Sequence, residues 1–229
     1  MCGRYSFVPT QKQLNEQLSE VELPQPLQLR FNIAPTQLAY VISNDQPHTL
    51  RQMSWGLVPY WSRDGANSGK LINARVEGLL EKPSFRIPAL RRHCLVPADS
   101  FYEWRSLPGK RKAPYRIRLQ NGELLFMAGI WDEWKGGSQV KHSFSILTTT
   151  PNAEVAPLHD RMPVLLLSAG SRQEWLETED PESIRAMLQT PAPNAILELY
   201  RVPERLNSAG AEGPDLHQPV KEEDDLTLF

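Results

Sequence analysis

The chain has 229 residues, of which 40% are hydrophobic, and a formal net charge of −2. This length and apolar content are enough for one large domain with a buried core. Only two cysteines are present, Cys2 and Cys94, which excludes a disulfide scaffold. No basic segment followed by an apolar run begins the chain, and no apolar run approaches membrane-spanning length. We therefore expect a cytoplasmic protein that has no membrane partner.

The charge is distributed unevenly along the chain. Residues 1–171 contain 20 Lys and Arg against 14 Asp and Glu, whereas residues 172–229 contain 5 against 13. A basic front and an acidic end are compatible with a nucleic-acid surface on the first three quarters of the chain. A mixed, solvated surface is the commoner reason for such an excess.

Helix and strand signals follow one another along the chain in no regular order. Helices are expected at residues 11–20 and 84–92, from Ser171, and from Asp180–Pro181. Two of these starts carry a capping box, Thr10 with Gln13 and Ser171 with Glu174. Strands are expected at residues 39–43, 49–55, 93–97, 100–104, 115–119, 124–130, 143–149, 162–167 and 196–202.

The clearest hairpin signal is Asn121–Gly122, which separates the strands at 115–119 and 124–130. Strands outnumber helices and do not alternate with them as β-α units do. The pattern therefore predicts an α+β fold in a single domain, with a largely antiparallel sheet that is curved or barrel-like and has flanking helices.

The first residues, Met1-Cys2-Gly3-Arg4, offer unusual chemistry. Methionine aminopeptidase removes Met1 when the next side chain is as small as cysteine, so Cys2 becomes the mature N-terminus. A terminal cysteine carries a thiol and a free α-amine that can act on the same carbon. The ordinary pKa of the α-amine is about 7.7 to 8.0 and that of the thiol about 8.5, so both have a reactive fraction near neutral pH.

Three later stretches place polar groups among apolar ones. They are Leu71-Ile72-Asn73-Ala74-Arg75-Val76-Glu77, Phe101-Tyr102-Glu103-Trp104 and Leu158-His159-Asp160-Arg161-Met162-Pro163. Each has an ordinary structural interpretation: Asn73 as a turn residue, Glu103 as a surface carboxylate and His159 as a structural histidine. If Glu103 faces inward, desolvation raises its pKa into the range of an acid/base catalyst.

Together, in this order and at these separations, the four stretches resemble the SOS-response-associated peptidase family, whose members crosslink to abasic sites in single-stranded DNA. The resemblance spans about residues 1–220. Phe31–Pro35, Trp55–Gly56 and Ser208–Glu212 are similar to further family segments. We therefore expect a family domain over residues 1–219, followed by an acidic, disordered tail over residues 220–229.

The resemblance implies a covalent reaction at Cys2. Its amine would form a Schiff base with the aldehyde of the opened abasic sugar, and its thiol would close a thiazolidine on the same carbon. His159 and Glu103 would transfer protons, and Asn73 would hydrogen-bond the opened sugar. The adduct would shield the site during replication and the SOS response to DNA damage.

The resemblance also implies how DNA is held. Arg4, Arg75 and Arg161 would bind phosphates, while Pro35 and Trp61 would contact the bases beside the abasic nucleotide. We expect a monomer in the cytoplasm, associated with the nucleoid, that needs neither a cofactor nor a metal ion. An autoproteolytic or peptidase activity stays open.

Two other functions fit part of the pattern. An N-terminal-cysteine glutamine amidotransferase also begins Met-Cys-Gly. The Arg-Gly and Asn-Gly motifs with which that family binds its substrate do not stand at the corresponding places in this sequence. A non-covalent single-strand binding module would use the arginines and aromatic residues without the chemistry of Cys2.

The acidic tail ends in apolar residues that a solubilising tail would not need. Leu226, Leu228 and Phe229 resemble the bacterial sliding-clamp-binding peptide, with Asp225 in place of its glutamine. The replication sliding clamp is therefore a candidate partner, and the alternative is a tail that is inert or packs on its own domain.

Overall fold

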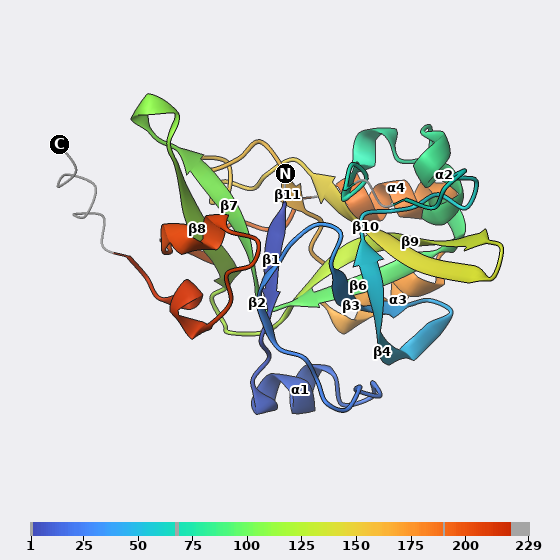
Figure 1. The fold of residues 1–229 in the computed structure, drawn as a ribbon, viewed down its shortest axis with the longest axis horizontal. Helices are drawn as coiled ribbons and strands as arrows, with labels where there is room; N and C mark the ends of the chain where they lie inside the picture. The colour runs from blue at the N-terminus through green and yellow to red at the C-terminus, as the bar shows by residue number, and fades with distance from the viewer. Residues whose placement is uncertain (1, 67–68, 190, 221–229) are drawn as a thin grey trace.

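Two β-sheets organise the residues that the computed structural model describes, which are 2–66, 69–189 and 191–220 (Figure 1). The strands are β1 (Arg4–Phe7), β2 (Arg30–Ile33), β3 (Leu38–Ser43), β4 (Gln46–Trp55), β5 (Asn73–Arg75), β6 (His93–Ala98), β7 (Ser100–Ser106), β8 (Lys112–Leu119), β9 (Leu125–Gly136), β10 (Gln139–Thr149), β11 (Met162–Pro163) and β12 (Leu197–Arg201). The helices are α1 (Gln11–Gln17), α2 (Pro83–Arg91), α3 (Ala169–Glu177) and α4 (Pro181–Gln189), with short 3₁₀ turns η1 (Val76–Gly78), η2 (Pro108–Lys110), η3 (Glu204–Asn207) and η4 (Pro214–His217).

One sheet is open and the other is closed. The open sheet has the antiparallel order β12-β8-β7-β1-β2. In the second, β10, β4, β3, β6 and β9 follow one another and β9 pairs again with β10, which closes a barrel. Among the pairings between the named strands of the described residues, those of β10 with β4 and β5 are the parallel ones. The expected α+β fold with a largely antiparallel, barrel-like sheet is confirmed.

The open sheet packs one face against the barrel. Tyr5 on β1 lies edge-on to Trp55 at 5.1 Å between ring centroids, and Trp55 stacks on Phe144 of β10. All three side chains are fully buried, and burial of side chains of this size stabilises a fold by about 1.5–3 kcal/mol each. Because strand residues alternate between faces, Tyr5 points to this core while its neighbours Arg4 and Ser6 point away from it.

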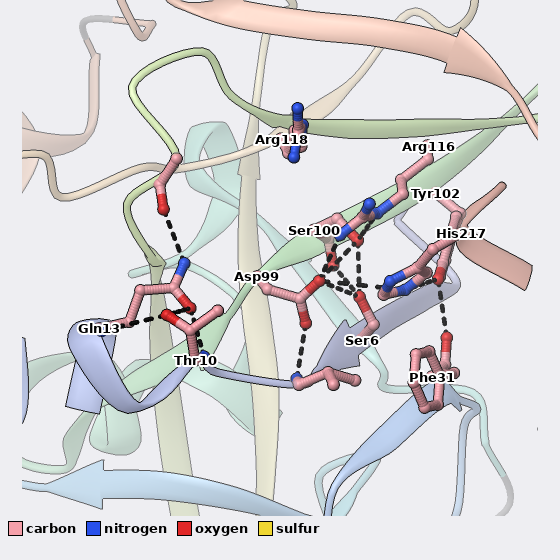
Figure 2. Close-up of polar contacts among 12 residues, drawn as sticks. Ser6, Thr10, Gln13, Phe31, Asp99, Ser100, Tyr102, Arg116, Arg118 and His217 are labelled. Atoms are coloured by element: carbon pink, nitrogen blue, oxygen red, sulfur yellow. Dashed lines mark hydrogen bonds and ion pairs between the residues drawn. The ribbon is translucent and has the colours of Figure 1, made fainter. Parts of the chain in front are cut away.

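The opposite face of the open sheet carries a buried polar network (Figure 2). Asp99 accepts hydrogen bonds from Ser6 Oγ and from Arg116 Nη2, at 3.0 and 2.6 Å. His217 Nε2 lies 2.9 Å from the hydroxyl of Tyr102. Residues 202–220 cover this face, as the red segment in Figure 1 shows, so the network links β1, β7 and β8 to the end of the described chain.

Of the four predicted helix starts, three are confirmed, including that of α2 at Pro83, and one is wrong. Thr10 and Gln13 form the capping box of α1, and Asp180 caps α4 through the Ser183 N–H. The box at the start of α3, however, pairs Ser168 with Ser171 rather than Ser171 with Glu174. A serine hydroxyl fills the position that a Glu or Gln usually occupies, so the helix begins three residues earlier than the sequence signal predicts.

The predicted hairpin at Asn121–Gly122 is also wrong. Gly122 does turn the chain, with φ of 73°, but β8 pairs with β7 and β12 whereas β9 pairs with β6 and β10. Helix α1 holds the connection, because Gln13 donates to the Gly122 carbonyl and Gln17 accepts from the Leu124 N–H. The strand expected at 162–167 is shorter as well, because β11 ends at Pro163 and continues only as a bridge between Leu165 and Met127.

Among the described residues, no helix combines the length and the apolar character that a membrane crossing needs.

Candidate functional site around Cys2

Cys2 lies where the open sheet meets the barrel, directly before β1. Its side chain is fully buried. Asn73 Nδ2, from β5 on the barrel side, donates a hydrogen bond of 2.8 Å to the Cys2 carbonyl. The Cys2 thiol donates to the Arg4 carbonyl at 3.7 Å. The ends of protein chains usually fray, but this one is tied to both sheets.

Glu103 faces inward beside Cys2. It stands on β7 next to Tyr102, which pairs with Arg4, and the residue is only 2% exposed. Burial raises the pKa of the Glu103 carboxyl to about 7, and the charge of Asp160 adds to the rise. A carboxyl that titrates near neutral pH can both give and take a proton.

The Cys2 thiol stays protonated in this setting. Burial raises the pKa of the thiol well above its ordinary value, and the nearby Glu103 carboxylate raises it further. The sulfur is therefore a poor first nucleophile at neutral pH, because the thiolate is the reactive form.

Asn73 and Thr148 present unpaired oxygen atoms on one face of β5 and β10. Asn73 pairs with Ile146 and Arg75 with Thr148, so the side chains of Asn73 and Thr148 share a face. Asn73 Oδ1 and Thr148 Oγ1 are buried and have no hydrogen-bond partner among the described residues. Such atoms are costly unless a ligand or water satisfies them. The sequence does not single out Thr148, because a threonine in an apolar run is an ordinary strand residue.

His159 sits in the loop before β11. Its Nδ1 accepts a hydrogen bond of 3.0 Å from the Arg161 N–H and lies 2.8 Å from an oxygen of Asp160. Partial burial lowers the pKa of the imidazole, and Asp160 opposes that change. In the neutral ring, Nδ1 as an acceptor leaves the proton on Nε2, while Asp160 is placed to stabilise the protonated ring.

The three predicted phosphate-binding arginines have different surroundings. Arg75 is exposed. Arg161 is 7% exposed, and its two terminal nitrogens bond the two oxygens of Glu77 at 2.5 and 2.9 Å. Arg4 is half-buried and donates to three oxygens of the protein. Arg75 is therefore the one of the three whose side chain lies open to solvent.

Trp61 is 53% exposed on the loop that follows β4, and its neighbour Tyr60 is 48% exposed. The hairpin β9–β10 fixes this loop. Asp132 accepts from the Tyr60 N–H at 2.8 Å, and Trp134 Nε1 donates to the Ser62 carbonyl at 2.7 Å. Two backbone positions of the loop are thus anchored, while the rings of Tyr60 and Trp61 face solvent.

Pro35 is half-buried and lies beside the other end of the same loop, since a Cβ added at Gly69 would stand 4.0 Å from the Pro35 Cβ. Across residues 2–66, 69–189 and 191–220, no group of three or more His, Cys, Asp or Glu side chains is arranged to hold a metal ion.

The family model of the SOS response associated peptidase (SRAP) matches residues 1–209. The chain belongs to the SRAP family. Abasic site processing protein YoqW of Bacillus subtilis is 38% identical over 223 residues, which cover 94% of this chain and 98% of that protein. Abasic site processing protein HMCES of Gallus gallus is 30% identical over 205 residues, covering 78% of this chain and 60% of that protein.

Solved structures have the same fold as this SRAP chain. A protein from Bacteroides thetaiotaomicron superposes with a TM-score of 0.83 at 24% identity, covering 96% of this chain and all of that one. A protein from Bordetella bronchiseptica gives a TM-score of 0.76 at 22% identity, with 88% of this chain and all of that one covered.

Proposed function

We propose that this SRAP protein processes abasic sites by forming a covalent thiazolidine between Cys2 and the opened sugar of an abasic nucleotide in single-stranded DNA. The observation that carries the proposal is the burial of Cys2 between Asn73 and Glu103. Burial raises the pKa of the Glu103 carboxyl to about 7. The relatives' names as abasic site processing proteins support the substrate.

The first step is attack by the amine. After removal of Met1, the lone pair of the Cys2 nitrogen adds to C1′ of the aldehyde, and a proton moves to the aldehyde oxygen to give a carbinolamine. Loss of that oxygen as water leaves a C=N bond. Glu103 supplies the proton for the departing water and accepts one from nitrogen, which suits a carboxyl with a pKa near 7.

The second step is ring closure by the thiol. The S–H adds across the C=N bond: sulfur bonds to C1′ and the proton goes to nitrogen. A thiol that burial keeps protonated fits this order, because it brings its own proton to the second step. The product is a five-membered ring, and two bonds must break to reverse it.

Asn73, Thr148 and His159 hold the opened sugar. The unpaired Asn73 Oδ1 and Thr148 Oγ1 are suited to its hydroxyl groups. His159 moves a proton as the sugar ring opens, with Asp160 stabilising the charged imidazole. An abasic nucleotide enters such a site cheaply, because it has no base to unstack or unpair.

DNA contacts follow from exposure. Arg75 binds a flanking phosphate, and Trp61 stacks on a neighbouring base with Pro35 at the side of the same loop. Arg4 and Arg161 keep their predicted phosphate contacts only if the DNA displaces or shares their bonds within the protein.

A denaturing gel tests the proposal. Protein with a mature Cys2 terminus should give a heat- and detergent-stable band with an abasic oligonucleotide and none with the intact strand. Cys2→Ser and an uncleavable N-terminal extension should both lose the band. Normal crosslinking by the extended protein would refute the amine mechanism. Binding without a stable band would instead favour a non-covalent binding module.

The remaining expectations belong to the same proposal. Residues 221–229 lie outside the described residues, so the clamp contact through Leu226, Leu228 and Phe229 stays a prediction from sequence. The domain boundary at 219, a monomeric state, a nucleoid-associated cytoplasmic location and a peptidase activity beyond removal of Met1 also stay predictions.

A further inference from the structure

Arg4 is bonded to the C-terminal part of the chain. Its Nη1 donates to Asn32 Oδ1 at 2.8 Å and to the Leu206 carbonyl at 2.9 Å, and its Nη2 donates to the Asn207 carbonyl at 3.2 Å. All three acceptors are neutral oxygens. The planar guanidinium group thus anchors Arg4, the first residue of β1, to three oxygen atoms at once.

Asn32 completes the arrangement from β2. It is fully buried, and its Nδ2 donates to the Ser208 and Ala211 carbonyls at 2.9 and 3.1 Å. The same amide therefore accepts from Arg4 and donates to the segment that Arg4 also contacts. Residues 204–217, which we call the C-terminal brace, are anchored here on the outer face of the open sheet.

A second anchor holds the brace further along. Glu212 accepts from Arg30 Nε at 2.7 Å and from the Phe31 N–H at 2.8 Å. Within the brace, an exposed ion pair between Arg205 and Asp215 does not touch β1. The brace is thus a fixed segment to which the Arg4 side chain is hydrogen-bonded.

We propose that Arg4 is a positioning residue for Cys2, acting with Asn32 through the C-terminal brace, and that this role rests on the proposed reaction at Cys2. Cys2 is two residues from Arg4, and Asn73 ties its carbonyl on the other side. The two ties keep a terminal nucleophile, which would otherwise fray, at one place in the site. Small losses of alignment cost reactions heavily, about 10²-fold for 1 Å.

The kinetics of adduct formation separate positioning from phosphate binding. Arg4→Lys keeps the charge but loses the fork, and Arg4→Gln keeps donors but loses the charge. Positioning predicts that both lower the rate constant at saturating abasic oligonucleotide by about tenfold or more, with an unchanged half-saturating concentration and salt slope. A phosphate contact predicts instead that Lys is tolerated and that Gln lowers the salt slope by about 0.7.

Asn32 supplies the test of a shared mechanism. Asn32→Ala should cause the same loss as Arg4→Lys, and the double variant should be little worse than either single one, since both remove one tie. Glu16→Gln, which removes an exposed ion pair with Lys12 on α1 outside the brace, is the control and should keep the wild-type rate constant. Losses that multiply in the double variant, or a rate constant that Arg4→Lys leaves intact, would overturn the proposal.

A second readout does not need DNA. Cys2 and Cys94 are both fully buried, so iodoacetamide reaches Cys2 in the folded protein only when the end of the chain frays. Arg4→Lys and Asn32→Ala should raise the alkylation rate of Cys2 about tenfold or more while Cys94 stays protected. Equal rises in the alkylation rate at both thiols would mean general unfolding. An unchanged rate at Cys2 would show that the C-terminal brace does not hold Cys2 in place. If the wild type forms no adduct, the proposed function fails while this measurement still decides the role of Arg4.

Discussion

At the residue scale, the environment of Glu103 matters most, because it changes the pKa of the carboxyl. It is 2% exposed, so its ionised form lacks most of the water that stabilises a surface carboxylate. The folded chain therefore holds a proton on Glu103 up to about pH 7, whereas the unfolded chain loses it near pH 4.5. Ionisation of this carboxyl therefore opposes folding.

Glu103→Gln should expose both roles. The rate of adduct formation should fall about 10²- to 10⁴-fold, the usual value of a positioned acid/base. Because the folded-state pKa is raised, the free energy of unfolding of the wild type should fall relative to the variant as pH rises from about 4.5 to about 7, by about 3 kcal/mol in total.

Denaturant melts of the two proteins at several pH values, beside adduct kinetics, measure these effects. If the free energies of unfolding of the two proteins change with pH in the same way, and the variant forms the adduct at the normal rate, Glu103 has a structural role instead.

The sequence named most residues of the candidate site but not their neighbours. Cys2, Asn73, Glu103 and His159 stand in short motifs, so a linear pattern suffices to single them out. The bonds of Arg4 to Leu206 and Asn207 join positions about 200 residues apart, and no local pattern predicts such a contact.

At the element scale, the loop after β4 is the part that presents aromatic rings. Gly65 has φ of 61°, and a Cβ there would meet the Trp134 ring at 2.6 Å. Lys141 Nζ also donates to the Gly65 carbonyl at 3.0 Å. The loop shape thus depends on one glycine packed against the β9–β10 hairpin.

Trp61→Ala should weaken binding of intact single-stranded DNA by about 1–3 kcal/mol, the value of one base stacked on an aromatic ring. Gly65→Ala should weaken binding in the same direction although it leaves the ring in place, because it displaces the loop. Fluorescence anisotropy at fixed salt measures both affinities. The saturating rate of adduct formation should be unchanged in Trp61→Ala, and full affinity in that variant would rule out stacking.

Element pairing shows where prediction from sequence stops. Strand positions follow from residue alternation, and most expected strands are present. Their partners depend on residues far away in the sequence. The strands on either side of Gly122 pair in different sheets, β8 with β12 and β9 with β6, and α1 binds the connection between them.

At the scale of the whole molecule, the C-terminal brace closes the outer face of the open sheet through His217. Burial lowers the pKa of His217 to about 4; Asp99 and Glu212 oppose the change, and Arg116 and Arg118 add to it. The neutral ring is therefore the form that the folded chain accepts. The absence of a helical or strand period in this segment is why the sequence did not predict the brace.

Acid should loosen this closure. The folded-state pKa of His217 lies below its ordinary value of 6.5, so the free energy of unfolding should fall as pH drops from about 6.5 to about 4, by about 3 kcal/mol from this group. In His217→Gln that part of the pH dependence should disappear. Urea melts of both proteins between pH 7 and pH 4 give the difference, and identical slopes would contradict the assignment.

The most direct test of the central claim counts free thiols in the DNA adduct. The chain has two cysteines, so denatured free protein should take up iodoacetamide at both Cys2 and Cys94. In a thiazolidine the sulfur of Cys2 is consumed, so the denatured adduct should show the mass of protein plus oligonucleotide less one water, with alkylation at Cys94 alone. An adduct of that mass that is alkylated at both cysteines would be an open Schiff base, and it would contradict ring closure by the Cys2 thiol.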